Sequence, residues 1–416
     1  MQKDPHERRR QRQQRAQQRE KEQKKQKKWL IVLGAAALIV LIAVLALIMT
    51  RCDGANEPAP TQPQQQVQQT SDEITSIRLT FGGDLTVTDE VVAAGGPEYN
   101  YTETFIDVAH LFGDSDLTAL NFEGLLYGSP YGTAGNGSAP QELVQALDKA
   151  GVDLLQVANS YSLNNGLAGL SATLDGVRQA GMEPVGAYAN RKQLQRNKGF
   201  TICNVNGIRV AFVAFTKGMG GYSIPQENAG CVNVLYTDYN DNYQTVDKEG
   251  IEKILSAVEE EKPDITVALL HWGSEFNDTI SQCQKDIVDI MQRNGVDAIV
   301  GTHSHYVQKM VYDQHSGSFV AYCLGDFFGD ASRAGSEYSV ILELEISKDN
   351  RSGRSKITNY QYTPIFTVRE EGQPMRVVRI REAMEAYENG YMNAVSEETY
   401  NAMNYALGRI EARIQG

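Results

Sequence analysis

Three of the six histidines stand where apolar, strand-like runs of the chain end. The run 265–270 is followed by His271, and the run 298–301 is followed by His303 and, two residues later, His305. Ligands and metal ions collect at the carboxyl ends of the strands in α/β sheets, and imidazole is a frequent metal ligand. A single histidine is more often a structural hydrogen-bonding group, but three at matching strand ends predict a site.

Acidic side chains follow two earlier strand-like runs. Asp84 comes after the run 77–81 and a pair of glycines, and Glu123 comes shortly after the run 117–120. Either carboxylate alone would be interpreted as a cap or turn residue. Together with imidazoles they form the mixed oxygen and nitrogen ligand set that Mn, Zn or Fe accepts, and a two-metal site of this kind activates water. The predicted metal ligands are Asp84, Glu123, His271, His303 and His305, with the last two pointing the same way from an extended segment.

The elements that must position these residues alternate between β-rich runs and amphipathic helices. Helices are predicted over 105–112, 140–150, 169–180, 248–261 and 279–294, and a hairpin is predicted around Asn206-Gly207. This alternation predicts a layered α/β domain with buried strands. Beyond residue 330 the pattern changes to antiparallel strands and a closing helix over 396–414, interpreted as part of the same domain, with a separate small domain as the alternative.

The first fifty residues differ sharply from the rest of the chain. Residues 1–28 carry twelve Lys/Arg against four Asp/Glu, whereas the remainder carries 27 against 48. Residues 29–50 contain no charge and are long enough, at about 1.5 Å per residue, to cross a bilayer. The positive arm predicts a cytoplasmic N-terminus, a single transmembrane helix and an extracellular C-terminal domain. The acidic bulk argues against nucleic-acid binding.

The predicted organisation therefore has five parts. They are a basic cytoplasmic arm (1–28), a transmembrane helix (29–50), a Gln- and Pro-rich disordered stalk (51–74), the main α/β domain (75–330) and C-terminal strands and a helix that complete it (331–416). The five cysteines contain no CxxC pair, which argues against a zinc ribbon. Sequence leaves open whether Cys203 and Cys231 form a disulfide.

Six short motifs in order resemble the CapA-type capsule-biosynthesis proteins, whose domain is related to calcineurin-like metallophosphatases. The matching segments are 81–84 (FGGD), 121–124 (NFEG), 158–170 (beginning AN), 270–275 (LHWGSE), 301–308 (GTHSHYVQ) and 324–327 (LGDF). The resemblance implies a metallophosphatase-like αββα sandwich that follows the transmembrane helix. It also implies a divalent metal (Mn, Zn or Fe) and a role in synthesis, export or anchoring of poly-γ-glutamate at the cell surface.

One motif departs from the family pattern. Where the family has an Asn-His pair, this chain has Ser160-Tyr161, and Asn164 replaces a carboxylate. A hydroxyl is a poorer ligand than an amide oxygen at this position, and tyrosines, with an ordinary pKa of about 10, shuttle protons poorly at neutral pH. The catalytic residues are left unassigned for this reason. The predicted substrate-binding residues are Asn159, Tyr161, Trp272, Glu275 and Asp326.

Three functions remain open at this point. The first is a membrane-anchored capsule or poly-γ-glutamate protein whose divergent metal pocket binds an anionic cell-surface polymer or contacts its biosynthetic membrane complex. The second is an active extracellular metal-dependent hydrolase acting on a phosphoester or a γ-glutamyl bond. The third is a metal-free membrane scaffold. The change at Ser160 and Tyr161 favours the first over the second, and the retained histidines argue against the third.

Overall fold

Period-two alternation of apolar side chains places one face of each central strand in a common core. In β6 (Ile208–Thr216), Val210 and Phe212 point into the core between two sheets, whereas Val213 and Phe215 point to the helices outside. The computed structural model describes residues 73–329, 331, 333–391 and 395–415, which belong to one compact unit. The predicted arm, the predicted transmembrane helix and nearly all of the predicted stalk lie outside these residues.

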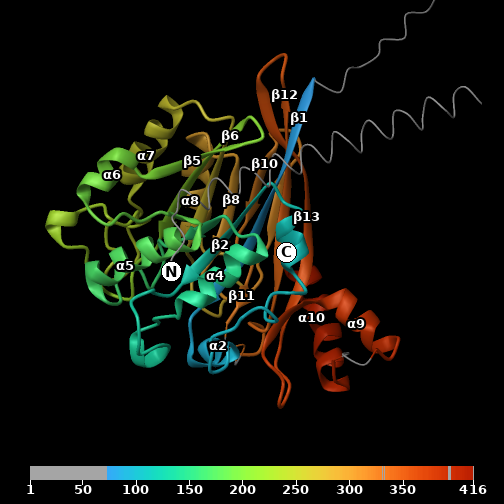
Figure 1. Cartoon of the computed structure of the whole chain (residues 1–416). Coiled ribbons are helices and arrows are strands. Elements are labelled where there is room, and N and C mark those ends of the chain that lie inside the picture. The colour runs from blue at the N-terminus through green and yellow to red at the C-terminus, as the bar shows by residue number, and fades with distance from the viewer. Residues whose placement is uncertain (1–72, 330, 332, 392–394, 416) are drawn as a thin grey trace, which may run out of the picture. The chain divides into compact units, whose positions relative to one another are not determined.

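The first sheet has eight strands and is parallel on one side and antiparallel on the other. Its order is β14-β13-β12-β1-β2-β3-β4, with β11 paired to β1 (Figure 1). The strands are β1 (Ile74–Thr86), β2 (Leu117–Glu123), β3 (Leu154–Gln156), β4 (Glu183–Val185), β11 (Asp326–Phe328), β12 (Tyr338–Asp349), β13 (Arg354–Val368) and β14 (Arg376–Arg379). The pairs β1–β2, β2–β3, β3–β4 and β1–β11 are parallel.

The second sheet has six strands in the order β5-β6-β7-β8-β10-β9. Besides β6, its strands are β5 (Phe200–Val205), β7 (Ile265–His271), β8 (Ala298–Thr302), β9 (Met310–Asp313) and β10 (Ser318–Ala321). The pairs β6–β7, β7–β8 and β8–β10 are parallel. Parallel strands therefore end at the same edge, and this edge is shared by His271 at the end of β7 and by the residues that follow β8.

Helices cover the outer faces of both sheets, which gives the αββα sandwich that the resemblance predicted. The helices α4 (Gln141–Ala150) and α5 (Gly166–Ala180) pack on the first sheet, and α7 (Lys248–Glu260) and α8 (Gln282–Arg293) pack on the second. Short helices α2 (Asp89–Ala94), α3 (Ala109–Gly113) and α6 (Arg191–Asn197) complete the connections. Among the described residues, no helix combines the length and apolarity needed to cross a membrane.

The C-terminal segment joins the first sheet. Its strands β12, β13 and β14 extend that sheet from β1, and α9 (Ile380–Glu388) and α10 (Glu397–Gln415) lie beside the lower ends of β12 and β13 (Figure 1). Met403, Ala406 and Ile410 of α10 are buried against the core between the sheets. The segment thus shares its hydrophobic core with the strands of the main domain.

Several local predictions are confirmed, and others are wrong. The helix α4 ends at Gly151 in the left-handed conformation, and Asn206 and Gly207 both have positive φ, as a two-residue hairpin requires. The predicted helix over 105–112 is replaced by turns and the short α3. The elements β11, β14 and α9 were not predicted. The four described cysteines, Cys203 and Cys231 among them, are free thiols.

Candidate metal centre

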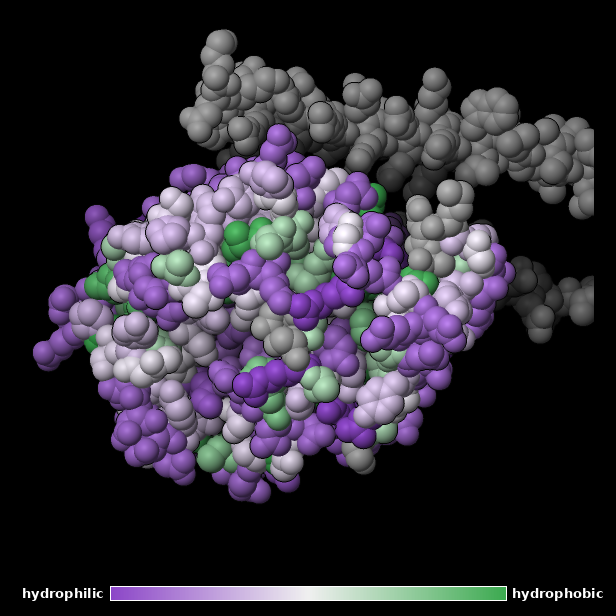
Figure 2. Space-filling view, turned by 90° about the horizontal axis from the view of Figure 1, so that it is seen from below, coloured by the Kyte–Doolittle hydropathy of each residue, from purple (hydrophilic) through white to green (hydrophobic). Residues whose placement is uncertain are grey.

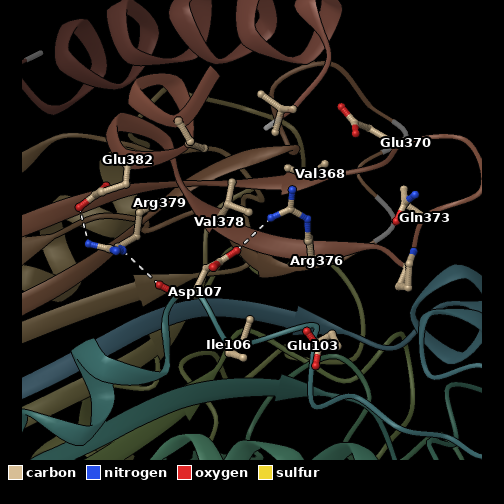
Figure 3. Close-up of a pocket in the computed structure, with 14 residues that line it drawn as sticks. Glu103, Ile106, Asp107, Val368, Glu370, Gln373, Arg376, Val378, Arg379 and Glu382 are labelled. Carbon is tan, nitrogen blue, oxygen red and sulfur yellow. Dashed lines mark hydrogen bonds and ion pairs between the residues drawn. The ribbon is translucent and has the colours of Figure 1, made fainter. Parts of the chain in front are cut away.

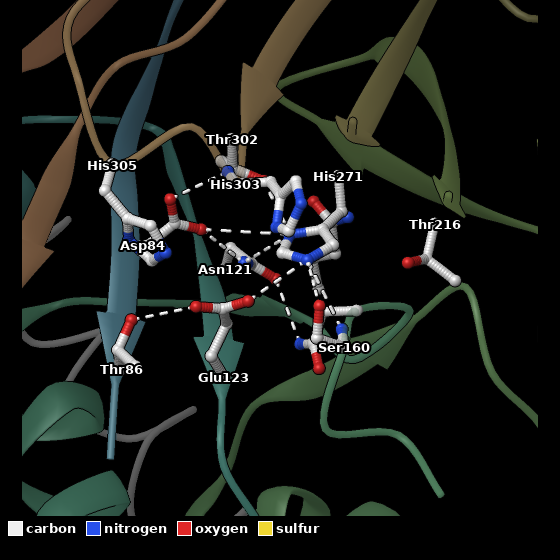
Figure 4. Close-up of polar contacts among 12 residues, drawn as sticks. Asp84, Thr86, Asn121, Glu123, Ser160, Thr216, His271, Thr302, His303 and His305 are labelled. Atoms are coloured by element: carbon white, nitrogen blue, oxygen red, sulfur yellow. Dashed lines mark hydrogen bonds and ion pairs between the residues drawn. The ribbon is translucent and has the colours of Figure 1, made fainter. Parts of the chain in front are cut away.

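The ends of strands from both sheets bring seven polar side chains together, and Figure 4 labels all of them except Asp326. Asp84 lies near the end of β1, Glu123 ends β2 and His271 ends β7. The others follow β3 (Ser160), follow β8 (His303 and His305) or begin β11 (Asp326). The two sheets therefore contribute opposite sides of one centre at the edge where their parallel strands end.

The first group of candidate ligands consists of Glu123, His271 and His303. One ligand atom from each lies within 4.8 Å of the others, and all three residues are buried. Glu123 Oε1 lies 3.1 Å from His271 Nε2, while Glu123 Oε2 accepts a hydrogen bond from Thr86 Oγ1 at 2.8 Å. The backbone N–H of Ser160 also points at His271 Nε2, at 3.3 Å. Nε2 accepts that bond only when it carries no proton, which is the state in which it binds a metal ion.

The second group consists of Asp84, His305 and Asp326, again within 4.8 Å and buried. His305 Nδ1 lies 2.7 Å from Asp326 Oδ1. Asp84 Oδ2 accepts a hydrogen bond from the backbone N–H of His303 at 2.8 Å, so the two groups share a backbone connection. His271 Nδ1 lies 4.0 Å from Asp84 Oδ1, which makes the groups immediate neighbours.

A close approach of two backbones sets the position of Asp84 relative to Asp326. A Cβ atom on Gly83 would lie 1.7 Å from the carbonyl oxygen of Gly325, so only glycine fits there. The N–H of Asp84 donates to that same carbonyl at 3.0 Å, and Asp84 is the register partner of Asp326 in the β1–β11 pair. The glycine pair before Asp84 thus lets β11 deliver a second carboxylate to the centre.

Two asparagines form a hydrogen-bonded chain that ends at the carboxylate of Asp84. Asn121 Nδ2 donates to Asp84 Oδ1 at 2.6 Å, and its Oδ1 accepts from Asn159 Nδ2 at 3.1 Å. Asn159 Nδ2 also donates to the carbonyl oxygen of Phe122 at 2.7 Å. The predicted substrate-binding residue Asn159 therefore uses its amide hydrogens in this network, where it orients Asn121 rather than facing a pocket.

The segment that carries His303 and His305 is not extended, so the prediction that both side chains point the same way is wrong. Both residues have positive φ, 88° and 58°, a conformation that costs a non-glycine residue about 1–3 kcal/mol. The turn sends the two imidazoles into different groups, with ring centroids 6.2 Å apart. His303 therefore belongs to the first ligand group and His305 to the second, although only one residue separates them in the chain.

Burial and neighbouring charges shift the pKa values of the centre in opposite directions. Burial raises the pKa of Asp84, with the nearby Glu123 adding to the shift, and burial raises the pKa of Asp326 to about 7. Burial acts to raise the pKa of Glu123 as well, but the neighbouring His271 outweighs this effect, so the pKa of Glu123 lies below its ordinary value. Burial and the neighbouring His271 hold the pKa of His303 well below its usual range, whereas the pKa of His305, despite burial, is raised by Asp326 to about 10.

The donor set fits a divalent cation. Three buried carboxylates lie together, and within the described part of the chain their ion-pair partners are the imidazoles of His271 and His305. His303 Nδ1 is buried and has no hydrogen-bond partner there either. A buried acceptor without a partner costs free energy, and a neutral imidazole nitrogen is a good ligand for Mn, Zn or Fe. A cation between these groups would satisfy both the carboxylates and this nitrogen.

The predicted substrate-binding residues are only partly placed at the centre. Asp326 lies in it, but as a partner of His305 in a ligand group. Glu275 is exposed and lies near Lys217. Burial lowers the pKa of Lys217, and the negative charge of Glu275 partly offsets this shift. The ring of Tyr161 lies against Gly137 in another loop. Trp272 is wrong as a substrate contact, because its indole is fully buried among the core residues under α7 and α8 and its N–H donates to the Tyr322 carbonyl at 2.8 Å.

Sequence reasoning did not assign roles to several residues that complete the site. Thr86 and Asn121 hold the carboxylates of Glu123 and Asp84, and Ser160 Oγ lies 3.0 Å from His271 Nε2. Asn121 belongs to a quoted motif, so its position at a strand end was a usable signal. Ser160 had drawn attention only as a departure from the family pattern, and Thr86, at the end of β1, carried no signal beyond its small polar side chain.

A larger opening lies elsewhere on the molecule, beside β13, β14 and α9 (Figure 3). This groove, of about 590 Å³, is lined by apolar and charged residues, and its two arginines form ion pairs within it. Arg376 contacts the Asp107 carboxylate at 3.0 Å, and Arg379 contacts both the Asp107 carbonyl and the Glu382 carboxylate. We call it the Asp107 groove. Both of its arginines are already paired with carboxylates, so the groove offers an anionic ligand little beyond space.

Comparisons with known proteins agree with the motif resemblance. The family described as bacterial capsule synthesis protein PGA_cap matches residues 78–331. The chain is 26% identical over 328 residues to the capsule biosynthesis protein CapA of Bacillus anthracis, covering 76% of this chain and 72% of that protein. It is 25% identical over 301 residues to the PGA biosynthesis protein CapA of Bacillus subtilis (strain 168), covering 70% and 73%.

Solved structures give weaker similarities. A putative 5'-nucleotidase from Staphylococcus aureus aligns with a TM-score of 0.46 at 14% identity, covering 80% of this chain and 58% of that one. The calcineurin-like phosphoesterase YfkN from Bacillus subtilis aligns with a TM-score of 0.43 at 15% identity, covering 82% and 99%. The family assignment rests on the sequence match, which spans both ligand groups from Asp84 to Asp326. The chain belongs to the bacterial capsule synthesis protein family PGA_cap.

Proposed function

We propose that this protein acts in capsule or poly-γ-glutamate synthesis, export or anchoring, and that its metal centre binds the anionic polymer. The observation that carries the proposal is the convergence of Asp84, Glu123, His271, His303 and His305 at one buried place in a chain of this family. The two relatives are named for capsule and PGA biosynthesis. The matches cover 72% and 73% of the two relatives, which supports a related function for this chain.

The ligand groups support one or two divalent ions. Glu123, His271 and His303 would hold one, and Asp84, His305 and Asp326 would hold a neighbouring one. When bound, such an ion polarises a coordinated carboxylate or phosphoryl oxygen and neutralises its charge. The described domain is otherwise acidic, so a polyanion needs a local positive site in order to bind. His305 would lose its proton to the solvent on binding a metal ion.

We favour polymer binding over fast hydrolysis. In the family pattern an Asn-His pair stands at the positions of Ser160 and Tyr161. Ser160 Oγ lies beside His271, but the Tyr161 ring packs against Gly137. A proton donor aimed at a bound substrate typically contributes about 10²–10⁴-fold to the rate, and the Ser160-Tyr161 pair lacks the imidazole that the family pattern has there.

The proposal includes a membrane anchor. Residues 29–50 form an uncharged stretch behind a strongly basic arm, which supports a single-pass helix with its N-terminus in the cytoplasm and the domain outside the cell. In that location the metal centre would face the cell-surface polymer and the membrane complex that makes it. Protease treatment of intact cells should digest the C-terminal domain and spare the arm.

The metal centre is tested with the full-length chain in mild detergent. The protein is stripped with chelator, reloaded with Mn²⁺ or Zn²⁺, dialysed and analysed for bound metal. We expect about one or two ions per chain, a loss in His303→Ala, and no change in the control His315→Ala, which removes an exposed histidine from the β9–β10 turn.

Polymer binding is then measured by calorimetry with poly-γ-glutamate. Binding should require the metal and be lost in His303→Ala. A wild-type chain that holds no metal after reloading would instead favour the metal-free scaffold. Rapid metal-dependent cleavage of a phosphodiester or a γ-glutamyl bond would favour the hydrolase.

A further inference from the structure

Three side chains form a stack beside the Asp84 group. The guanidinium carbon of Arg333 lies 3.9 Å from the centre of the Phe276 ring. That ring in turn stacks on the imidazole of His305, with centroids 4.8 Å apart and planes 19° from parallel. Because His305 belongs to a candidate ligand group, the stack fixes an arginine next to the metal centre.

The backbone holds the middle of the stack in place. Phe276 has a φ of 52°, and its N–H donates to the carbonyl of Ser304, the residue between the two histidines, at 2.9 Å. A strained non-glycine residue persists only when its surroundings fix it, and such residues concentrate at functional sites. The loop after β7 is thus tied to the loop after β8, with the Phe276 ring as a platform between them.

The backbone of Arg333 is fixed as well. Its carbonyl oxygen accepts hydrogen bonds from the N–H and the hydroxyl of Ser336 at 3.0 and 2.9 Å. The side chain remains exposed to solvent above the Phe276 ring. An arginine that is ordered in this way loses less conformational freedom when it binds a ligand.

The charge of Arg333 is not compensated within the described part of the chain. No carboxylate there forms an ion pair with it, although most described arginines of this acidic domain have such a partner. Lys217, another cation near the centre, differs: its Nζ donates to the Gly273 carbonyl at 2.7 Å and lies 4.5 Å above the Tyr243 ring. Arg333 therefore keeps its N–H donors available to a ligand.

The surroundings favour a polar ligand. Figure 2 shows the end of the molecule at which β1 and β2 finish, and its surface is mostly hydrophilic with small, separate hydrophobic patches. A guanidinium binds a carboxylate through two parallel hydrogen bonds. A polymer that carries one carboxylate on every unit would place one at the metal centre and another within reach of a neighbouring cation.

We propose that Arg333, held on Phe276, binds a second carboxylate of the anionic polymer while a first is held at the metal centre. The inference rests on the proposed function and adds a residue that recognises the substrate. It makes Arg333 a specificity determinant that distinguishes a chain of carboxylates from a single one. We assign Lys217 no equivalent role, because its ammonium group donates to the Gly273 carbonyl and lies against the Tyr243 ring.

The test uses the full-length, Mn²⁺-loaded protein and a synthetic γ-linked glutamate decamer as the probe, with calorimetry as the readout. We expect Arg333→Gln to weaken decamer binding by roughly tenfold or more, since a charge-assisted bidentate pair is lost. The decamer affinities of Arg333→Lys and Phe276→Leu should lie between those of the wild type and Arg333→Gln. Binding of monomeric glutamate and the content of bound metal should not change in Arg333→Gln or Arg333→Lys.

The matched control is Arg354→Gln, which removes the same charge from an exposed arginine at the start of β13, the backbone register partner of Asp349 in β12. Equal weakening in Arg333→Gln and Arg354→Gln would reduce the effect to overall charge and overturn the proposal. Unchanged binding in Arg333→Gln, with loss in His303→Ala, would overturn it and leave the proposed function intact. A wild-type protein that ignores the decamer would overturn both. Tighter binding of polyphosphate than of the decamer would overturn the carboxylate assignment.

Discussion

The metal centre and the Asp107 groove carry similar charged side chains but treat them in opposite ways. In the centre, Asp84 and Glu123 are at most 2% exposed and face imidazoles, and His303 Nδ1 is buried without a hydrogen-bond partner among the described residues. In the groove, Asp107 is 41% exposed and is paired with Arg376, itself 28% exposed. The groove has a volume of about 590 Å³, yet both arginines that line it are already paired with carboxylates.

The difference teaches that buried charges with incomplete compensation indicate a ligand site more reliably than the volume of a groove does. A carboxylate half in water and next to an arginine costs little and contributes little, typically below about 1 kcal/mol. Removing a carboxylate from water without a full counter-charge is expensive. The fold tolerates three such groups at one place, together with two strained histidines, and the proposed cation would supply the physical reason.

The largest expected effect is stabilisation by metal in the centre alone. A divalent ion at about one hundred times its dissociation constant should raise the free energy of unfolding by about 3 kcal/mol. Asp84→Asn should abolish this gain, whereas Asp107→Asn should keep it. Urea unfolding with and without chelator measures the effect. An equal gain in both variants would mean that the ion binds elsewhere and would break the comparison.

A carboxylate remote from the metal centre isolates the effect of burial. Asp297, just before β8, has its pKa raised to about 6 by burial, although the backbone N–H of Thr266 donates to it. Since the folded value lies above the unfolded value of about 3.9, the folded state binds more protons between them. Stability should therefore fall as the pH rises from about 4 to about 6 and stay lower above that.

Asp297→Asn should remove this loss, because its side-chain oxygen can still accept the Thr266 bond. We expect a gain of about 2 kcal/mol at pH 8 relative to wild type and little difference at pH 4. The control Asp116→Asn changes an exposed aspartate that accepts the Arg78 N–H in the same way. A gain of equal size in the control would show that burial is not the cause.

The smallest effect belongs to the groove. Asp107→Asn breaks the ion pair with Arg376, and we expect the free energy of unfolding to fall by less than about 1 kcal/mol because both side chains reach solvent. Urea denaturation measures this loss, and metal analysis checks that the content of bound metal is unchanged. A loss above about 2 kcal/mol would show that the groove is structurally more important than its exposure indicates.

Sequence reasoning recovered most of the elements whose signals are local. The helix α4 with its glycine cap, the hairpin at Asn206-Gly207 and the strand before His271 are each visible in composition or periodicity. The three-residue strand β11 is not, because its pairing with β1 depends on the contact between Gly83 and Gly325, far apart in the chain. Short elements of this kind are defined by tertiary partners.

The site was predictable to a similar extent and for the same reason. Strand ends located the five proposed ligands, all of which lie in the two ligand groups. Trp272 was misjudged because an aromatic residue at a strand end is as often core as ligand contact, and only burial separates the two. Asp326 was assigned to substrate because its partner His305 cannot be identified from spacing. The stack of Arg333 on Phe276 joins two loops and left no pattern in the sequence.

The pairing of Asp84 with Asp326 has a consequence for the order of folding. Their strands are neighbours in the sheet but lie at opposite ends of the family segment, residues 78–331. Contacts between distant parts of a chain form slowly because a long loop must close first. We therefore expect the Asp84 group to assemble only after both sheets have formed and β11 has docked on β1. Metal capture by a newly made chain would then mark the completion of its folding.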